Sequence, residues 1–234
     1  MLEISRIQAI TLDLDDTLWP IWPTIAEAEL RLQAWLALRA PATASLFGNL
    51  QQRQRLRDQV AEAWPQRHYD LSFIREEMIR LGLRLSDEDT NLAEPAFAVF
   101  FAARQQVTLF DDSLPALQKL SARWPILALS NGNADVERIG LADYFCGSVS
   151  ARDVGAAKPD ARIFLAAAAR LQLAPEAILH VGDDESLDVL GAQKVGMQTA
   201  WVNRSDKLWA FDSKPSIRVT SMAELSDALL GSSF

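Results

Sequence analysis

Residues 13–18 read Asp-Leu-Asp-Asp-Thr-Leu and place three carboxylates within four positions of the chain. They follow Ile7 to Leu12, a short apolar run with little alternation, which is typical of a strand covered on both faces in a parallel sheet. Residues two apart in an extended segment point the same way, so Asp13 and Asp15 are expected to face one site. Because these carboxylates repel one another, we expect a hard divalent cation to compensate them.

A second acidic cluster lies later in the chain, where residues 182–188 read Gly-Asp-Asp-Glu-Ser-Leu-Asp directly after the apolar run from Ala177 to Val181. Taken alone, Asp15 or Asp16 could simply cap the following turn, which is a common role of aspartate. Two acidic clusters at two strand ends are harder to explain in this way. The carboxyl ends of parallel strands form the ligand-binding edge of an open sheet, so we expect the clusters to meet there.

Further short apolar runs predict more strands of the same sheet: Pro125 to Leu129, Thr199 to Val202 and Ile217 to Val219. Helical patterns separate most of them, and the clearest are Leu114 to Ala122 and Asp160 to Leu171. Ser221 with Glu224 predicts a capping box for the final helix. This alternation predicts an α/β fold, a Rossmann-like parallel sheet flanked by helices.

Residues 19–106 have a different pattern, with apolar residues at helical spacing and no strand-like run. We expect them to form a helical insert of about four helices. The core is then discontinuous, with residues 1–18 joining residues 107–234.

Three local signals within this insert predict the ends of helices. Thr24 with Glu27 is typical of a capping box that opens the first helix. Gly82 follows an apolar stripe and is expected to end a later helix. Pro95 predicts a kink or a restart in the last part of the insert.

The bulk composition is that of a globular protein with a sizeable core, since 49% of the 234 residues are hydrophobic and 23% are charged. The net charge of -8 leaves no broad cationic surface for a phosphate backbone, so we expect no nucleic-acid partner. No apolar stretch approaches the roughly 20 residues of a membrane span, and no secretory signal is apparent, so we expect a cytoplasmic protein without a membrane partner. The single cysteine, Cys146, is expected to be a small buried residue.

Two further elements fall at the expected ligand-binding edge. Ser130 and Asn131 directly follow an expected strand, where a hydroxyl and free backbone N–H groups could hold anionic oxygens. Lys158 precedes a helix and could supply a cation for the same charge. Alone, Ser130 would more often be a helix cap, and Lys158 a solvated surface lysine.

Taken together and in this order, these elements resemble the four motifs of the haloacid-dehalogenase superfamily. Residues 13–17 resemble the first motif, Ser130 the second, Lys158 the third and residues 182–188 the fourth. The resemblance covers essentially the whole core. It implies a phosphohydrolase with a Rossmann-like core, in which residues 19–106 resemble the helical cap of the first structural class.

The resemblance also implies a role for each acidic residue. Asp13 would be the nucleophile that takes up the phosphoryl group, and Asp15 would act first as an acid and then as a base. Mg2+ would be held by Asp13, the backbone carbonyl of Asp15 and Asp183, with Asp188 on the ion or just behind it. Asp184 would be an outer contributor.

The same resemblance implies that Lys158, Ser130 and the backbone N–H groups near Asn131 bind and position the transferring phosphoryl group. Three alternatives remain open. A 2-haloacid dehalogenase would generally lack the second aspartate, here Asp15, whereas a sugar phosphomutase would share it. A non-catalytic Mg2+-binding interaction module would be favoured only if a catalytic position were replaced.

The expected partner is a small phosphate ester, and the protein is expected to be a monomer or a weak homodimer. Residues 127–134, 178–184 and 196–201 resemble the corresponding segments of bacterial phosphatases that act on riboflavin-pathway phosphates such as flavin mononucleotide (FMN). A broad specificity for sugar phosphates or nucleotides is the alternative. Trp19 and Trp22 lie within nine residues of Asp13 and are candidates to touch such a substrate. His180 is interpreted as a strand residue without a catalytic role.

Overall fold

The structure is a computed structural model that describes residues 2–231. The chain forms two compact units, one made of residues 1–20 and 108–234 and the other of residues 21–107. The first unit contains every expected motif residue, and the second coincides closely with the expected helical insert. Each unit has its own apolar core.

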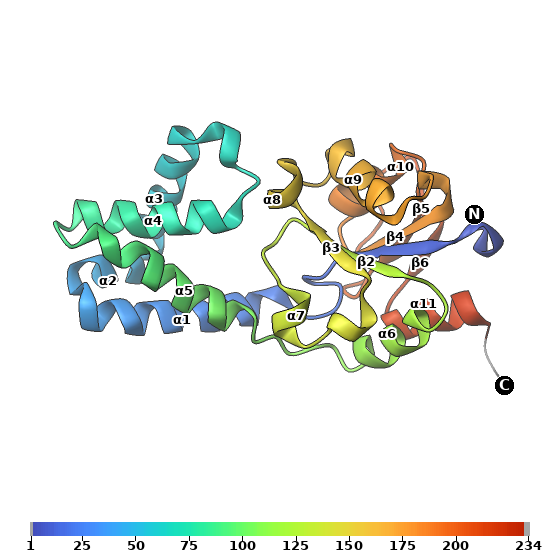
Figure 1. Ribbon diagram of the computed structural model, residues 1–234, viewed down its shortest axis with the longest axis horizontal. Coiled ribbons are helices and arrows are strands. Elements are labelled where there is room, and N and C mark those ends of the chain that lie inside the picture. Colours follow the sequence, from blue (N-terminus) through green and yellow to red (C-terminus); the bar gives the residue numbers. More distant parts are fainter. Residues whose placement is uncertain (1, 232–234) are drawn as a thin grey trace. The chain divides into compact units, whose positions relative to one another are not determined.

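The first unit is built on a six-stranded, fully parallel sheet with the order β3-β2-β1-β4-β5-β6 (Figure 1). Its strands are β1 (Ala9–Leu12), β2 (Ile126–Ser130), β3 (Gly147–Ser150), β4 (Ile178–Gly182), β5 (Gln198–Val202) and β6 (Ile217–Val219). The predicted α/β class with a Rossmann-like sheet is confirmed. Five of these strands overlap the expected runs, and β3 was not predicted.

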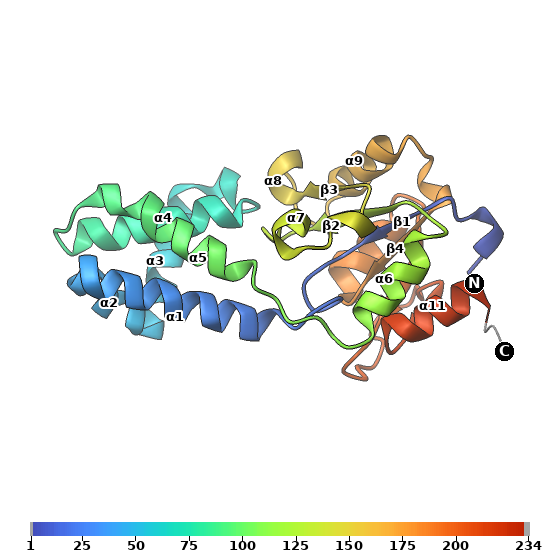
Figure 2. The same ribbon diagram turned by 60° about the horizontal axis from the view of Figure 1, so that its bottom comes forward.

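Helices cover both faces of this sheet. α6 and α11 pack together on one face, whereas α9 and α10 lie on the other (Figures 1 and 2). The helices are α6 (Ser113–Ser121), α7 (Val136–Ile139), α8 (Ala151–Val154), α9 (Ala161–Leu171), α10 (Gly191–Gln193) and α11 (Met222–Leu230), with short turns η1 (Ile4–Arg6), η4 (Ala142–Tyr144), η5 (Pro175–Ala177) and η6 (Glu185–Leu190). Ser221 caps α11 by accepting a hydrogen bond from the Glu224 N–H, as its capping pattern predicts.

The central strand β1 explains why the motifs converge. Its four residues are all buried, because β2 and β4 flank it and helices cover both faces. The register pairs Leu12 with Ala128 on one side and Val181 on the other. The chain therefore leaves β1, β2 and β4 at the same edge of the sheet, where Asp13, Ser130 and Asp183 follow or end the strands.

The second unit is entirely helical and packs around its own apolar core. Its helices are α1 (Ile21–Arg39), α2 (Pro41–Gly48), α3 (Leu50–Ala63), α4 (Leu71–Leu85) and α5 (Ala93–Arg104), with short turns η2 (Pro65–Arg67) and η3 (Thr90–Leu92). Fully buried side chains such as Leu32 and Leu36 of α1 and Ile79 of α4 form one cluster. The helical character of this segment follows from its apolar spacing, which buries one side of each helix.

Several local expectations in the chain are corrected. α1 begins at Ile21, so Thr24 lies buried inside the helix and is not its cap. Gly82 lies within α4 and does not end it. Cys146 is exposed and not buried. By contrast, the restart expected near Pro95 is confirmed: α5 begins at Ala93, after η3, and Pro95 lies in its first turn, where no helical hydrogen bond requires its N–H.

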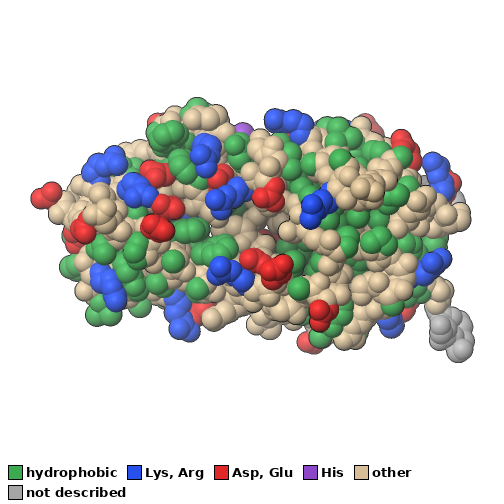
Figure 3. Space-filling view, viewed as in Figure 1, with side chains coloured by type: hydrophobic (Ala, Val, Ile, Leu, Met, Phe, Trp, Pro, Cys, Tyr) green, Lys and Arg blue, Asp and Glu red, His purple; other side chains and the backbone are tan. Residues whose placement is uncertain are grey.

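The surface carries charges of both signs. On the face drawn in Figure 3, Lys and Arg side chains are interspersed with Asp and Glu side chains and do not gather into one basic patch. Within residues 2–231, no helix has both the length and the apolar character of a membrane span.

Candidate active site

A buried lysine joins two of the acidic motif residues. The Lys158 Nζ donates hydrogen bonds to Asp13 Oδ1 at 2.5 Å and to Asp188 Oδ1 at 2.6 Å. All three side chains are nearly inaccessible to solvent. Asp13 itself is held at the end of β1, because its N–H donates to the Val181 carbonyl at 2.9 Å. The structure thus brings together the first, third and fourth motifs.

Three carboxylates at this edge are arranged so that they could hold a metal ion. One oxygen from each of Asp13, Asp183 and Asp188 lies within 4.8 Å of the others. Opposite ligands of an octahedral Mg2+ are about 4 Å apart, and Mg2+ prefers oxygen ligands. With Lys158 among them, three carboxylates and one ammonium leave two negative charges, which a divalent cation would balance. The donor set therefore fits Mg2+.

Burial and mutual repulsion shift the pKa values of this cluster. Burial first, and then the Asp188 charge, raise the pKa of Asp183 to about 7. Burial also raises the pKa of Asp13, against the opposing effect of Lys158. Burial would lower the pKa of Lys158, but the adjacent Asp13 and Asp188 carboxylates outweigh it and raise that pKa. The lysine therefore remains a cation at neutral pH.

Asp188 is oriented by a buried network behind it. Its Oδ1 lies 3.1 Å from His180 Nε2, and His180 Nδ1 lies 2.9 Å from Thr11 Oγ1. A carboxylate only accepts, so Nε2 carries the proton, and the Thr11 hydroxyl donates to Nδ1. Burial lowers the pKa of His180, which keeps the ring neutral. His180 is thus a positioning residue, a role that the sequence analysis missed.

The chain around Asp184 supports the same carboxylate. The Asp184 N–H donates to Asp188 Oδ2 at 3.0 Å, and its side chain accepts from the N–H groups of Ser186 and Leu187 at the start of η6. Asp184 therefore caps the turn that carries Asp188. Gly182 leaves room for this turn, because a Cβ there would lie 2.2 Å from Asp188 Cγ.

Asp15 lies on a tight turn after the first strand. The Trp19 indole N–H donates to Asp15 Oδ1 at 2.8 Å, and the Asp16 N–H donates to the Trp19 carbonyl at 2.7 Å. Trp19 is fully buried, so it presents no open ring face to a substrate and instead orients Asp15. This corrects the expectation that Trp19 contacts substrate. Trp22, 75% exposed, belongs to the helical unit.

The second motif brings two side chains to the site, the Ser130 hydroxyl and the Asn131 amide. The Asn131 side chain makes two hydrogen bonds to the backbone of Lys158. Its Nδ2 donates to the Lys158 carbonyl at 3.0 Å, and its Oδ1 accepts from the Lys158 N–H at 2.7 Å. Ser130 Oγ accepts from the Gly132 N–H at 2.9 Å, so the hydroxyl proton remains available to an incoming oxygen. Sequence reasoning had considered only the backbone N–H groups near Asn131.

Thr17 is a further site residue that the sequence analysis did not assign. Its hydroxyl lies 3.3 Å from Asp13 Oδ2 and 3.4 Å from Asp183 Oδ1. A hydroxyl has one proton, so it is shared between the two carboxylates. Its place four residues after Asp13 in the first motif was the available signal.

Comparison with known proteins agrees with this geometry. Residues 7–196 match the family of haloacid dehalogenase-like hydrolases. The chain belongs to this family. This haloacid dehalogenase-like hydrolase is 34% identical to the 5-amino-6-(5-phospho-D-ribitylamino)uracil phosphatase YigB of Escherichia coli (strain K12), over 97% of this chain and 98% of that protein.

Other relatives of this hydrolase have different names. It is 31% identical to the phosphoserine phosphatase of Thermus thermophilus over 64% of this chain and 63% of that one. A crystal structure of a 2-haloacid dehalogenase from Pseudomonas syringae pv. Tomato DC3000 superimposes with a TM-score of 0.90 at 35% identity, covering 96% of this chain and 98% of the other. The family is thus established. Its members named here include both phosphatases and a 2-haloacid dehalogenase.

Proposed function

We propose that this hydrolase is a Mg2+-dependent phosphatase that cleaves a small phosphate monoester through an aspartyl-phosphate. The observation that carries the proposal is the grouping of Asp13, Asp183 and Asp188 oxygens within 4.8 Å, with the Lys158 ammonium hydrogen-bonded to two of these residues. Such a site attracts a metal and a tetrahedral oxyanion together. The named relatives from Escherichia coli and Thermus thermophilus, both phosphatases, support this choice.

In the first step a carboxylate oxygen of Asp13 attacks phosphorus, and the bond between phosphorus and the ester oxygen breaks. Asp15 gives its proton to the departing oxygen. In the second step Asp15 removes a proton from water, and that water attacks the phosphorus of the aspartyl-phosphate. Inorganic phosphate leaves, and the Asp13 carboxylate is restored.

Other residues lower the barrier by binding charge. Asp13 and Asp183, with Asp188 and the Asp15 carbonyl, would hold Mg2+, which when bound offsets repulsion between the nucleophile and the phosphate. Lys158 and the Ser130 hydroxyl bind the oxygens of the transferring group. Asn131 keeps Lys158 in place through its two hydrogen bonds to the lysine backbone.

The substrate we propose is a riboflavin-pathway phosphate, either FMN or the phosphorylated ribitylaminouracil named for the Escherichia coli relative. In both, the phosphate terminates a ribityl chain. We propose that the helical unit, residues 21–107, is a cap that admits this substrate and then excludes water.

The 2-haloacid dehalogenase reaction is the competing function, and the named Pseudomonas syringae structure favours it. Hydrolysis of a carbon–halogen bond needs neither a metal nor an acid for the leaving group. This chain has a carboxylate triad that could bind a metal and an oriented Asp15 that could protonate a leaving group. These features favour the phosphatase.

The test is phosphate release from FMN, sugar phosphates and nucleotides, with and without Mg2+, by the wild type and by Asp13→Asn. We expect release from at least one ester, abolished by chelation and reduced by at least about 10³-fold in the variant. Asp227→Asn, at an exposed position on α11, is the matched control and should leave the rate unchanged. Halide release from 2-haloacids without metal, and no phosphate release, would establish the competing reaction.

A further inference from the structure

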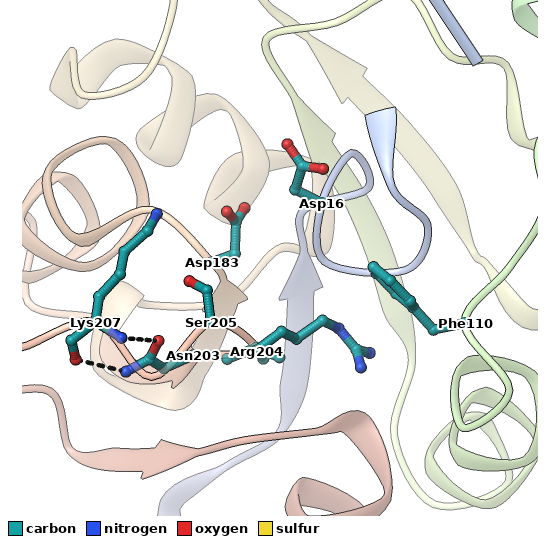
Figure 4. A pocket seen from close by; sticks show the side chains of 8 residues that line it. Asp16, Phe110, Asp183, Asn203, Arg204, Ser205 and Lys207 are labelled. Carbon is teal, nitrogen blue, oxygen red and sulfur yellow. Dashed lines mark hydrogen bonds between the residues drawn. The ribbon is translucent and has the colours of Figure 1, made fainter. Parts of the chain in front are cut away.

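A pocket of about 190 Å³ lies beside the metal-binding carboxylates in the α/β unit. One wall is the turn that carries Asp16, and the other is the loop after β5 that carries Ser205 and Lys207; Asp183 is shared with the proposed metal site (Figure 4). This volume holds about six waters, which is the scale of a short polar chain. Apart from Asp183, no residue that lines the pocket takes part in the steps proposed above.

Hydrogen bonds hold the base of the loop after β5 in place. Buried Asn203 makes two hydrogen bonds to the backbone of Lys207, from Nδ2 to its carbonyl at 2.8 Å and from its N–H to Oδ1 at 2.9 Å. Arg204 donates to both carboxylate oxygens of Asp112 and to the Thr17 carbonyl, and its guanidinium lies 4.0 Å from the centre of the Phe110 ring. These contacts fix the start of the loop to the rest of the α/β unit.

These contacts distinguish Arg204 from Lys207, the two cations that line the pocket. The Arg204 charge is neutralised by Asp112, and its side chain extends toward Phe110 (Figure 4). The Lys207 ammonium has no ion-pair partner among residues 2–231, and together with the Ser205 hydroxyl it lies on the same side of the loop as Asp183 (Figure 4). Lys207 is therefore the cation that this pocket offers to a ligand.

The polar groups of the pocket suit hydroxyls better than a second phosphate. Asp16 offers a carboxylate that only accepts hydrogen bonds, Lys207 offers an ammonium that only donates, and Ser205 does both. A hydroxyl can donate to the first and accept from the second. A dianion would instead meet the Asp16 charge directly.

We propose that this pocket receives the hydroxyl-bearing leaving group, so that the enzyme selects phosphates of polyols and sugars over phosphates of apolar alcohols. This rests on the proposed phosphatase function. Asp183, a proposed metal ligand, also lines the pocket, so a leaving group released at the metal site lies beside it. The phosphate end of the substrate would bind at the metal site, and its hydroxyl-bearing end would bind in the adjacent pocket.

Two esters of equal chain length test the proposal: ribitol 5-phosphate, which has hydroxyls, and n-pentyl phosphate, which has none. We expect the wild type to prefer ribitol 5-phosphate in kcat/KM by at least about tenfold, because a site built to bind hydroxyls discriminates against analogues without them. Lys207→Met, which keeps the aliphatic stem, should reduce that ratio about tenfold, mainly through KM. Ser205→Ala should reduce it in the same direction.

Lys214→Met is the matched control, because it removes the same charge from an exposed position later in the same connection between β5 and β6. It should leave both rates and their ratio unchanged. An equal preference for both esters in the wild type, or an unchanged ratio in both pocket variants, would overturn the pocket assignment alone. Failure of the wild type to release phosphate from any ester would instead overturn the proposed function.

Discussion

His180, a buried residue of β4, positions the Asp188 carboxylate. It holds Asp188 through Nε2, and Thr11 fixes its tautomer. Groups behind metal ligands typically change metal affinity 10–100-fold when removed. We expect His180→Ala to raise the Mg2+ concentration for half-maximal phosphatase activity about tenfold.

Two controls separate this effect from a general loss of stability. His180→Gln keeps a donor and should recover part of the Mg2+ affinity. His68→Ala changes the only other histidine, in the helical unit, and should leave the Mg2+ dependence unaltered. If His180→Ala lowers the melting temperature but leaves half-saturation by Mg2+ unchanged, the positioning role is wrong.

We expect Asp183 to make the stability of the metal-free protein depend on pH. Its pKa is raised to about 7 by burial and by the Asp188 charge, whereas an unfolded aspartate has a pKa of about 3.9. Between these values the folded chain holds a proton that the unfolded chain has released. The free energy of unfolding therefore falls as pH rises through this window, and the stability from this group is fully present only below about pH 4.

Asp183→Asn cannot titrate and should remove this dependence. Without metal at about pH 8, we expect the variant to be more stable than the wild type by about 1–2 kcal/mol, and the difference should vanish near about pH 4. Added Mg2+ should stabilise only the wild type. Denaturant unfolding at the two pH values measures this, with Asp227→Asn as the control. A less stable variant at about pH 8 would contradict the prediction.

At the scale of the element, the sequence was informative where burial produces a strong pattern. Central strands such as β1 and β4 are buried on both faces and read as apolar runs. β3 is an edge strand, Gly-Ser-Val-Ser, with a single buried residue, so it carries no such signal. Asp13, Ser130 and Asp183 were found because they lie at the ends of central strands, whereas Lys158 was found from its place before a helix and in the order of the motifs. The contacts of His180 and Asn131 join residues that are far apart in the sequence, so local sequence patterns do not reveal them.

Gly82 illustrates the same limit within α4. A glycine after an apolar stripe is a common helix end, but here packing decides. A Cβ at Gly82 would lie 2.9 Å from Phe47 Cε2 and 3.3 Å from Thr43 Cγ2. The glycine lets α4 approach α2 closely, so its function is in packing and not in termination.

Gly82→Ala should therefore destabilise the helical unit although alanine favours helices. We expect a loss of about 1–2 kcal/mol, because overpacking at a rigid buried ring exceeds the gain in propensity. Gly48→Ala, whose Cβ would be no closer than 3.4 Å to Gln33 Nε2, should cost less. In a Phe47→Leu background the Gly82→Ala cost should shrink. Urea unfolding of the four variants measures this coupling, and a stabilising Gly82→Ala would contradict it.

At the scale of the whole molecule, the helical unit is an insertion into a complete α/β unit. The chain leaves and re-enters that unit at neighbouring points, since the Phe110 N–H and the Ser113 hydroxyl both donate to the Leu18 carbonyl, at 3.0 Å and 2.8 Å. All six strands and all residues of the carboxylate triad lie outside the insertion. The α/β unit should therefore fold and bind metal by itself.

We expect a variant in which residues 21–107 are replaced by a short Gly-Ser linker to keep its sheet and its thermal stabilisation by Mg2+. Its kcat/KM should fall at least about 100-fold, because a cap that excludes water and completes the substrate site is gone. Circular dichroism and melting with and without Mg2+ test the fold, and phosphate release tests the cap. Asp183→Asn in the same background should abolish the Mg2+ shift. An unfolded α/β unit would show that its core depends on the insertion, and undiminished turnover would show that the helical unit is not a cap.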